Sequence, residues 1–412
     1  MELLHQRCAG LDVHKETVVA CLRVAENGEV ACDVRSFPTT TAGLLDLSAW
    51  LSEQRCTHVA MEATGVYWKP VWHVLEGTFE LVLANAAHVK NVPGRKTDVN
   101  DATWIAELLA HGLIRGSFVP PRPIQEVRDL TRTRKQLVRE IARHTQRIQK
   151  TLEDANIKMT GVVSDMLGRT GRTILDAMVA GETNPERLAE LGPRLKASRE
   201  KLVEAFRGRL TDHHRFLLKL HLGQVDALKT AVEEVEQRLG ALLEPFRYAE
   251  ELLTDMPGVS QTVAQGVISE IGVDMSRFPT DGDLLSWTGI CPRSDTSAGK
   301  HRSTRVRKGN PWLKTLLVQA AWAAVRTKDS DYRAQFLRLK SRRGPKKAIV
   351  AVAASMLTAM YYMLRDGVVY QDLGADHFHR LDAARRSRTI NRLVSRLKEL
   401  GCEVELTEKD AA

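Results

Sequence analysis

The hydrophobic pattern of this chain changes its period at three closely spaced prolines, and this change constrains the fold more than any other feature. Before Pro120, Pro121 and Pro123, short apolar runs alternate with helical patterns. After them, from Glu126 to about Pro245, the pattern is almost wholly helical. Proline fixes φ and removes a backbone donor, so a cluster of three interrupts helices and strands alike. We therefore expect an α/β domain followed by a separate helical region.

Within the first 120 residues, the expected order is three strands, a helix, a strand, a helix, a strand and a helix. Glu26-Asn27-Gly28 supplies a hairpin turn between the second and third strands. Three strands in a meander followed by strand–helix alternation is the ribonuclease-H-like order, in which the first and fourth strands are neighbours. The expected strands are Cys8–Val13, Thr17–Val24, Val30–Phe37, Thr57–Glu62 and Phe79–Ala84, and the expected helices run from a cap at 39–41 through Ala49–Leu51, over Tyr67–Leu75, and over Val99–His111.

Four carboxylates fall at positions that this topology brings together. Asp12 ends the first expected strand, and Glu62 ends the fourth. Asp98 and Asp101 lie three residues apart at the start of the last helix of this region, so both can face the same side. Such a cluster is strongly unfavourable unless divalent cations neutralise it. Mg²⁺ suits it, because Mg²⁺ takes hard oxygen ligands and keeps positions for water and phosphate, and two such ions assist a phosphodiester displacement.

Each acid also has a purely structural interpretation. Asp98 can cap the helix, and Asp101 can complement the helix dipole. Glu62 is harder to explain in this way, because a carboxylate at the end of an apolar strand is costly without a partner. The joint placement on this strand order, rather than any single residue, therefore supports a metal-dependent nuclease-like site.

The helical middle of the chain carries two apolar seams. One of them runs with interruptions from Val127 to Ile148. Two interpretations remain open: a long coiled-coil arm that dimerises the protein, or a helical bundle that buries the same seams within one chain. The other seam repeats with alternating spacings of three and four, as in a coiled coil, at Val225, Leu228, Val232, Val235, Leu239 and Leu242.

The segment between Cys291 and Val350 is strongly basic. It holds sixteen Lys and Arg against three Asp, a net charge of +13, whereas the whole chain nets +9. A charge run is usually a solvated face, but a surplus of this size without compensating acids is typical of a surface that binds nucleic acid. The expected phosphate contacts are Lys300, Arg302, Arg305, Arg307, Lys308, Arg342, Arg343, Lys346 and Lys347.

The mostly helical C-terminal unit begins with an expected helix, a tight turn at Met256-Pro257-Gly258-Val259 and a second helix. Such a helix-hairpin-helix presents backbone N–H groups to a phosphate, with Gly258 as the expected contact. Ser260 stands where these hairpins often have a second glycine, and it can instead cap the second helix. The loop 293–310 then places Ser294, Ser297 and Ser303 beside glycines and basic residues.

Other classes of protein are disfavoured by composition. The six cysteines are scattered without a C-x-x-C pair, which argues against a zinc site and a disulfide framework. The N-terminus lacks the features of a signal peptide. The best apolar run, Ala348–Leu364, is short for a membrane span and carries Ser and Thr. We expect a cytoplasmic protein without membrane association.

Two groups of motifs resemble one known family, the DEDD family of bacterial insertion-sequence transposases, which also includes the Piv-type DNA invertases. The resemblance covers both ends of the chain but not the helical middle. At the N-terminal end, the motifs similar to the family's three acidic motifs are Gly10-Leu11-Asp12-Val13-His14-Lys15, Met61-Glu62-Ala63-Thr64-Gly65 and Lys96-Thr97-Asp98-Val99-Asn100-Asp101-Ala102. At the C-terminal end, they are Met256-Pro257-Gly258-Val259, Gly289-Ile290-Cys291-Pro292, Ser297-Ala298-Gly299-Lys300 and Arg307-Lys308-Gly309-Asn310.

The resemblance implies a RuvC-like N-terminal domain that binds Mg²⁺ and a C-terminal transposase domain whose serine, here Ser297, attacks DNA covalently. It further implies homodimers or tetramers, and a structured noncoding guide RNA that selects target and donor DNA. The protein would be cytoplasmic and nucleoid-associated in a bacterium. The expected domains are 1–120 (RuvC-like, metal-binding), 121–246 (coiled-coil dimerisation), 247–375 (transposase) and 376–412 (polar helix and tail).

Three functions are compatible with these motifs. The first is an RNA-guided transposase, a DNA recombinase that cuts and rejoins strands by phosphodiester transesterification. The second is a hydrolytic, RuvC-like junction-resolving nuclease, for which Ser297 is a bystander and no protein–DNA adduct forms. The third is a noncatalytic nucleic-acid-binding scaffold, which predicts that the acidic side chains are separated or paired with Lys or Arg.

Overall fold

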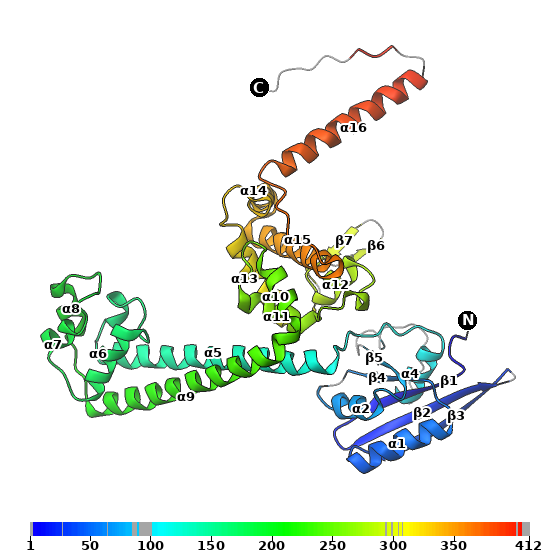
Figure 1. Ribbon diagram of the computed structural model, residues 1–412, viewed down its shortest axis with the longest axis horizontal. Helices are drawn as coiled ribbons and strands as arrows, with labels where there is room; N and C mark the ends of the chain where they lie inside the picture. Colours follow the sequence, from blue (N-terminus) through cyan, green and yellow to red (C-terminus); the bar gives the residue numbers. More distant parts are fainter. Residues whose placement is uncertain are drawn as a thin grey trace. The chain divides into compact units, whose positions relative to one another are not determined.

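The chain divides into two compact units, residues 1–119 and 120–412 (Figure 1). Each unit buries its own apolar core. The computed structural model describes residues 3–26, 28–63, 65–84, 89, 101–292, 295–297, 300–303, 305–306, 308–400 and 403–405.

The first unit is an α/β domain built on a five-stranded mixed sheet. Its strands and helices are β1 (Arg7–Val13), β2 (Thr17–Glu26), β3 (Glu29–Pro38), α1 (Thr41–Glu53), β4 (His58–Glu62), α2 (Trp68–Leu75), β5 (Glu80–Ala84) and α4 (Asp101–Ala110). The strand order is β3-β2-β1-β4-β5. Because β1 pairs antiparallel with β2 and parallel with β4, the prediction that the first and fourth strands are neighbours is confirmed.

The two faces of this sheet are covered by different helices (Figure 1). Leu11 of β1 and Met61 of β4 belong to the core that α1 and α2 complete. Cys8 of β1 and Ala60 of β4 belong to the core on the α4 side. Since successive side chains of a strand point to opposite faces, the even-numbered positions of β1 and β4 face α4.

Gly10 lets α4 pack directly on β1. A Cβ at this position would lie 2.2 Å from the carbonyl oxygen of Ala102 and 2.3 Å from the backbone nitrogen of Ala106. Any side chain there would therefore push the helix away from the sheet. The first turn of α4 therefore packs on β1 at Gly10, which precedes Asp12 by two residues.

The second unit begins with an arm of two long helices, α5 (Arg122–Asp154) and α9 (Asp212–Leu243), which pack against each other (Figure 1). In the α9 seam, Val225 and Leu239 are buried and the other four positions are half-buried. Val225 shares a core with Ile148 of α5, so the seam is covered within one chain, and dimerisation through it remains a prediction. The end of the arm carries η1 (Met159–Gly161), α6 (Arg169–Val179), α7 (Pro185–Glu190) and α8 (Arg199–Phe206).

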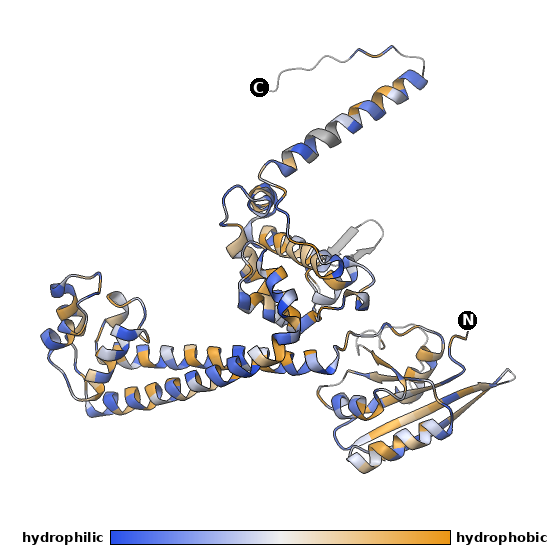
Figure 2. Ribbon diagram, viewed as in Figure 1, coloured by the Kyte–Doolittle hydropathy of each residue, from blue (hydrophilic) through white to orange (hydrophobic). Residues whose placement is uncertain are grey.

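In the described residues, the rest of the second unit consists mainly of helices, with one short hairpin. Its elements are η2 (Glu244–Phe246), α10 (Arg247–Thr254), α11 (Gln261–Ile271), η3 (Met275–Arg277), α12 (Asp281–Thr288), β6 (Asp295–Ser297), β7 (Lys300–Ser303), α13 (Pro311–Ala324), α14 (Asp331–Arg343), α15 (Pro345–Asp366) and α16 (His377–Glu399). By length and composition α15 could cross a membrane, and half of its most apolar stretch is buried. It packs against α12, α13 and α14, which accounts for its apolar character (Figure 2).

Candidate functional site

Asp12 and Glu62 occupy neighbouring strand ends in the first unit. Asp12 is the penultimate residue of β1, and Glu62 is the last residue of β4. The parallel register pairs Gly10 with Ala60 and Leu11 with Met61, so Asp12 and Glu62 follow directly on adjacent strands. Both are even-numbered and therefore face α4, and both are only partly buried.

Asp101 is the first residue of α4, in the helical turn that packs on β1 at Gly10. The fold therefore carries this third acid to the same face of the sheet as Asp12 and Glu62. Asp98, the fourth predicted acid, lies outside the described residues. Close packing of α4 on β1 at Gly10 places Asp101 on this face of the sheet.

The immediate partner of Asp12 is a histidine. His14 Nε2 lies 3.2 Å from Asp12 Oδ2, and the carboxylate side chain is 21% exposed. Within the described part of the chain, neither Asp12 nor Glu62 forms an ion pair with Lys or Arg. Over the same residues, no group of three or more His, Cys, Asp or Glu side chains is assembled closely enough to hold a metal ion. The described acids supply oxygen donors suited to a hard divalent cation, so the donor chemistry fits, and the tetrad as a metal site remains a prediction.

Ser297 ends the first strand of the hairpin in the second unit. β6 and β7 pair antiparallel, with Ser297 opposite Lys300 and Asp295 opposite Ser303. Ala298 and Gly299 lie outside the described residues, and only the backbone of Ser297, Lys300 and Arg302 is described. The predicted nucleophile is thus located at the tip of a short hairpin, and its role stays a prediction.

The remaining predicted phosphate contacts fall into two groups. Arg305 and Lys308 are exposed in the segment after β7, whereas Arg307 lies outside the described residues. The second group surrounds Gly344, which has a φ of +78° and separates α14 from α15. All four of its basic residues are exposed, as a polyanion-binding surface requires: Arg342, Arg343, Lys346 and Lys347.

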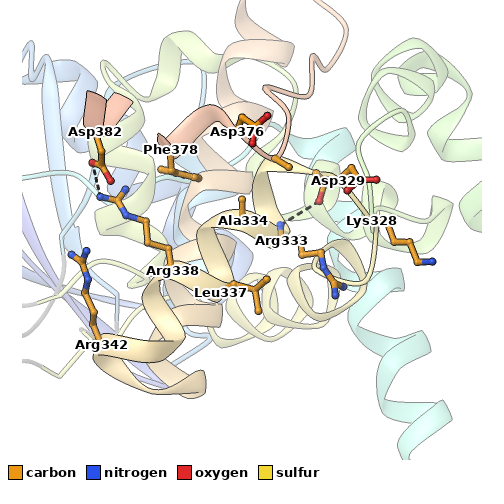
Figure 3. Close-up of a pocket in the computed structure, with 12 residues that line it drawn as sticks. Lys328, Asp329, Arg333, Ala334, Leu337, Arg338, Arg342, Asp376, Phe378 and Asp382 are labelled. Atoms are coloured by element: carbon orange, nitrogen blue, oxygen red, sulfur yellow. Dashed lines mark hydrogen bonds and ion pairs between the residues drawn. The ribbon is translucent and has the colours of Figure 1, made fainter. Parts of the chain in front are cut away.

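Arg342 also lines a pocket of about 730 Å³ between α14 and the segment that leads into α16. Arg338 and Arg342 extend from α14 on the same side of this pocket (Figure 3). Arg338 donates to Asp382 of α16 at 2.9 Å, and its guanidinium lies 5.3 Å from the centre of the Phe378 ring. Arg338 is therefore held by its own chain, while Arg342 has no carboxylate partner among the residues that the structure describes.

Gly258 has a structural reason to be glycine. Its φ is +80°, and a Cβ would lie 2.5 Å from the carbonyl oxygen of Ala320 and 2.5 Å from the nitrogen of Ala324 in α13. Ser260 caps α11, because its hydroxyl accepts from the backbone N–H of Val263. The turn between α10 and α11 is thus fitted against α13, and phosphate binding by Gly258 remains a prediction.

Glu270, which belongs to none of the sequence motifs, connects three helices of this unit. Its side chain is 4% exposed and accepts two hydrogen bonds from Arg132 of α5, each of 2.8 Å. It also accepts from the side-chain amide of Asn310, whose Oδ1 caps α13 at Trp312 and Leu313. The last residue of the Arg307–Asn310 motif therefore joins the arm to the first turn of α13.

We expect nucleic-acid binding by this chain to weaken steeply with salt if, as predicted, the exposed basic residues contact phosphates and displace counterions. For six to ten contacts, the affinity for duplex DNA should fall roughly 10³–10⁵-fold between about 50 and 200 mM salt. Fluorescence anisotropy with a labelled duplex over this range measures the slope. A nearly flat dependence would show that these residues do not bind phosphates.

Comparisons with known proteins agree on one family. A transposase model of the DEDD, IS110 type matches residues 9–157, and a model described as the transposase IS116/IS110/IS902 family matches residues 250–337. An insertion element IS110 protein of Streptomyces coelicolor is 26% identical over 68% of this chain and 73% of its own length. The transposase for insertion sequence element IS1111A of Coxiella burnetii is 25% identical over 70% of this chain and 72% of its own length. A putative transposase of Sinorhizobium fredii is 27% identical over 67% and 68%, respectively.

Proposed function

Because the chain belongs to the IS116/IS110/IS902 family of insertion-sequence transposases, we propose that it cuts and rejoins DNA strands through a serine–DNA intermediate. Membership of this family implies that the protein binds and transposes DNA. The finer assignments are Ser297 as the nucleophile, a divalent cation, Mg²⁺, at Asp12, Glu62, Asp98 and Asp101, and a noncoding guide RNA. We also propose that the first unit is RuvC-like and that the arm is a coiled coil. The protein then assembles as dimers or tetramers.

The observation that carries the proposal is the packing of α4 on β1. It keeps Asp101 on the face of the sheet where Asp12 and Glu62 end adjacent strands. A scaffold protein would keep the acids apart or pair them with Lys or Arg; within the described part of the chain, Asp12 lies beside His14 and not beside Lys or Arg. Carboxylates that end adjacent strands on one face of a sheet suit a catalytic role, because a divalent cation would offset the cost of bringing them together.

The chemistry that we propose conserves the number of phosphodiester bonds. The Ser297 hydroxyl oxygen forms a bond to the scissile phosphorus, the serine proton leaves to a base, and the bond to a deoxyribose oxygen breaks. A serine hydroxyl is a poor nucleophile at neutral pH and needs activation. A divalent cation, when bound, would lower the cost of oxyanion charge on the phosphate. The carboxylates of the first unit would hold it, while the basic residues that follow β7 orient the DNA.

Metal removal tests this proposal on the full-length protein. With DNA that carries the ends of its own element, we expect strand cleavage in Mg²⁺ and none in a chelator such as EDTA. DNA binding should persist in the chelator, since the phosphate contacts lie on Lys and Arg side chains. Denaturing gels report cleavage, and anisotropy reports binding. Equal cleavage with and without the chelator would contradict the proposed metal site.

A further inference from the structure

A second pocket, of about 340 Å³, lies within the second unit and is lined by residues of α5, α9, α11 and α13. One part of its wall is apolar and is formed by Val138, Leu239 and Leu316. The indole of Trp312, in the first turn of α13, adds a flat aromatic surface. A volume of this size, with apolar walls and a few polar groups, is typical of small-ligand pockets.

Three cationic side chains of α5 lie close to the ring of Trp312. The guanidinium carbons of Arg132 and Arg139 and the ammonium nitrogen of Lys135 each lie 5.5 Å from the centre of its ring. A cation at this distance is attracted by the negative face of an indole. Three of them around one ring nevertheless repel one another, so the arrangement needs negative charge nearby.

The carboxylate that the pocket contains is already engaged. Glu270 binds Arg132 through both oxygens, and Arg128 Nε lies 3.6 Å from one of them. Within the described part of the chain, no carboxylate lies within ion-pair distance of Lys135 or Arg139. Among the described residues, the positive charges of Lys135 and Arg139 therefore have no ion-pair partner, and Glu270 offsets that of Lys135 only in part.

The local environment of Lys135 shows the cost of this arrangement. Burial lowers the pKa of its ammonium group, the charge of Arg139 lowers that pKa further, and Glu270 opposes the shift only in part. A bound anion beside Lys135 would act in the opposite direction, because it stabilises the charged form.

We propose that this pocket binds one unpaired nucleotide of a single-stranded nucleic acid, with a phosphate at Lys135 and Arg139 and a base against Trp312. The cations supply the phosphate contacts, and the indole with its apolar neighbours supplies a stacking surface. A pocket of about 340 Å³ between these helices suits a single extruded nucleotide and is too small for a duplex. This inference adds a binding site to the proposed function and rests on it only where the ligand is the guide RNA, because the binding needs neither metal nor strand cleavage.

The test measures affinity of the full-length protein for short probes in EDTA. The probes are fluorescein-labelled oligothymidylate and oligouridylate of about 12 nucleotides, and a duplex of the same length. In the Lys135→Gln, Arg139→Gln protein, affinity for the single strands should fall about tenfold or more, and the salt slope should decrease by about 1.4 for two lost contacts. Trp312→Leu should also weaken single-strand binding about tenfold, since it removes the stacking surface. The better-bound of the two strands identifies RNA or DNA as the ligand.

A matched control removes equal charge from the same helix. Arg143 and Lys150 are exposed on α5 and do not line the pocket. The Arg143→Gln, Lys150→Gln protein should bind the single strands within about threefold of the unaltered chain. Equal losses in the two double variants, or losses as large for the duplex as for the single strands, would overturn the proposal. Thermal unfolding confirms that each variant is folded, and strand cleavage in Mg²⁺ reports separately on the recombinase function.

Discussion

The Asp12→Asn and Glu62→Gln proteins should lose strand cleavage by about a thousandfold or more and still bind DNA. Each substitution keeps the size of the side chain and removes one negative charge from the proposed metal ligands. Losing several kcal/mol of transition-state stabilisation by the metal corresponds to a rate loss of this order. Cleavage of end-labelled DNA under single-turnover conditions gives the rate, and anisotropy gives the affinity.

Matched substitutions elsewhere in the first unit separate the site from general effects of charge. Asp46 is exposed on α1, on the side of the sheet away from α4, and Glu80 begins β5 at the opposite end of the strands. Asp46→Asn and Glu80→Gln remove the same charge and should leave cleavage within about twofold, as expected for surface positions. Cleavage at the normal rate in Asp12→Asn or Glu62→Gln would refute the acidic site and favour a noncatalytic role for these residues.

The arrangement of the first unit could be predicted because its pattern is local. The strands are short runs rich in apolar and β-branched residues, and the strand order follows from the order of elements along the chain. The pattern did not predict how closely α4 packs on the sheet. This packing depends on Gly10, where the missing side chain admits the backbone of α4, and a glycine in a strand has several possible meanings.

The partner of the α9 seam could not be predicted in the same way. A repeat of three and four shows which face of a helix is apolar, but it does not say which helix covers that face. In the structure α5 lies along α9, as the arm's ion pair between Arg134 and Glu236 also shows. Contacts between the arm and a second chain would depend on the other faces of α5 and α9.

Glu270 was not predicted as a functional residue, although the residues around it indicate that its carboxylate needs partners. It lies in an apolar stretch, between Ile268 and Ile271, where an unpaired carboxylate is costly. The same argument singled out Glu62 at the end of β4. Its partners, Arg132 and Asn310, are far away in the chain and come together only through packing of α5, α11 and α13. Sequence alone therefore shows that such a residue needs partners but not which ones.

The Ser297→Ala protein should bind DNA and metal but form no covalent protein–DNA adduct. Transesterification needs an oxygen nucleophile on the protein, and alanine has none. Ser294→Ala and Ser303→Ala remove hydroxyl groups from the same basic segment and should remain active. Denaturing gels of the protein with labelled DNA show the adduct as a shifted band, and protease treatment should remove the shift.

The serine variants also distinguish the two enzymatic functions, because only one of these functions conserves the energy of the broken phosphodiester bond. A serine–DNA bond retains that energy, so rejoining needs no external source, and strand joining should disappear together with the adduct in Ser297→Ala. A hydrolytic nuclease transfers the phosphate to water, which leaves free ends and makes cleavage independent of Ser297. If Ser297→Ala still cleaves while Asp12→Asn does not, the acidic residues act in a junction-resolving nuclease. If both lose cleavage and only Ser297→Ala retains metal binding, the serine and the carboxylates serve one reaction in different roles.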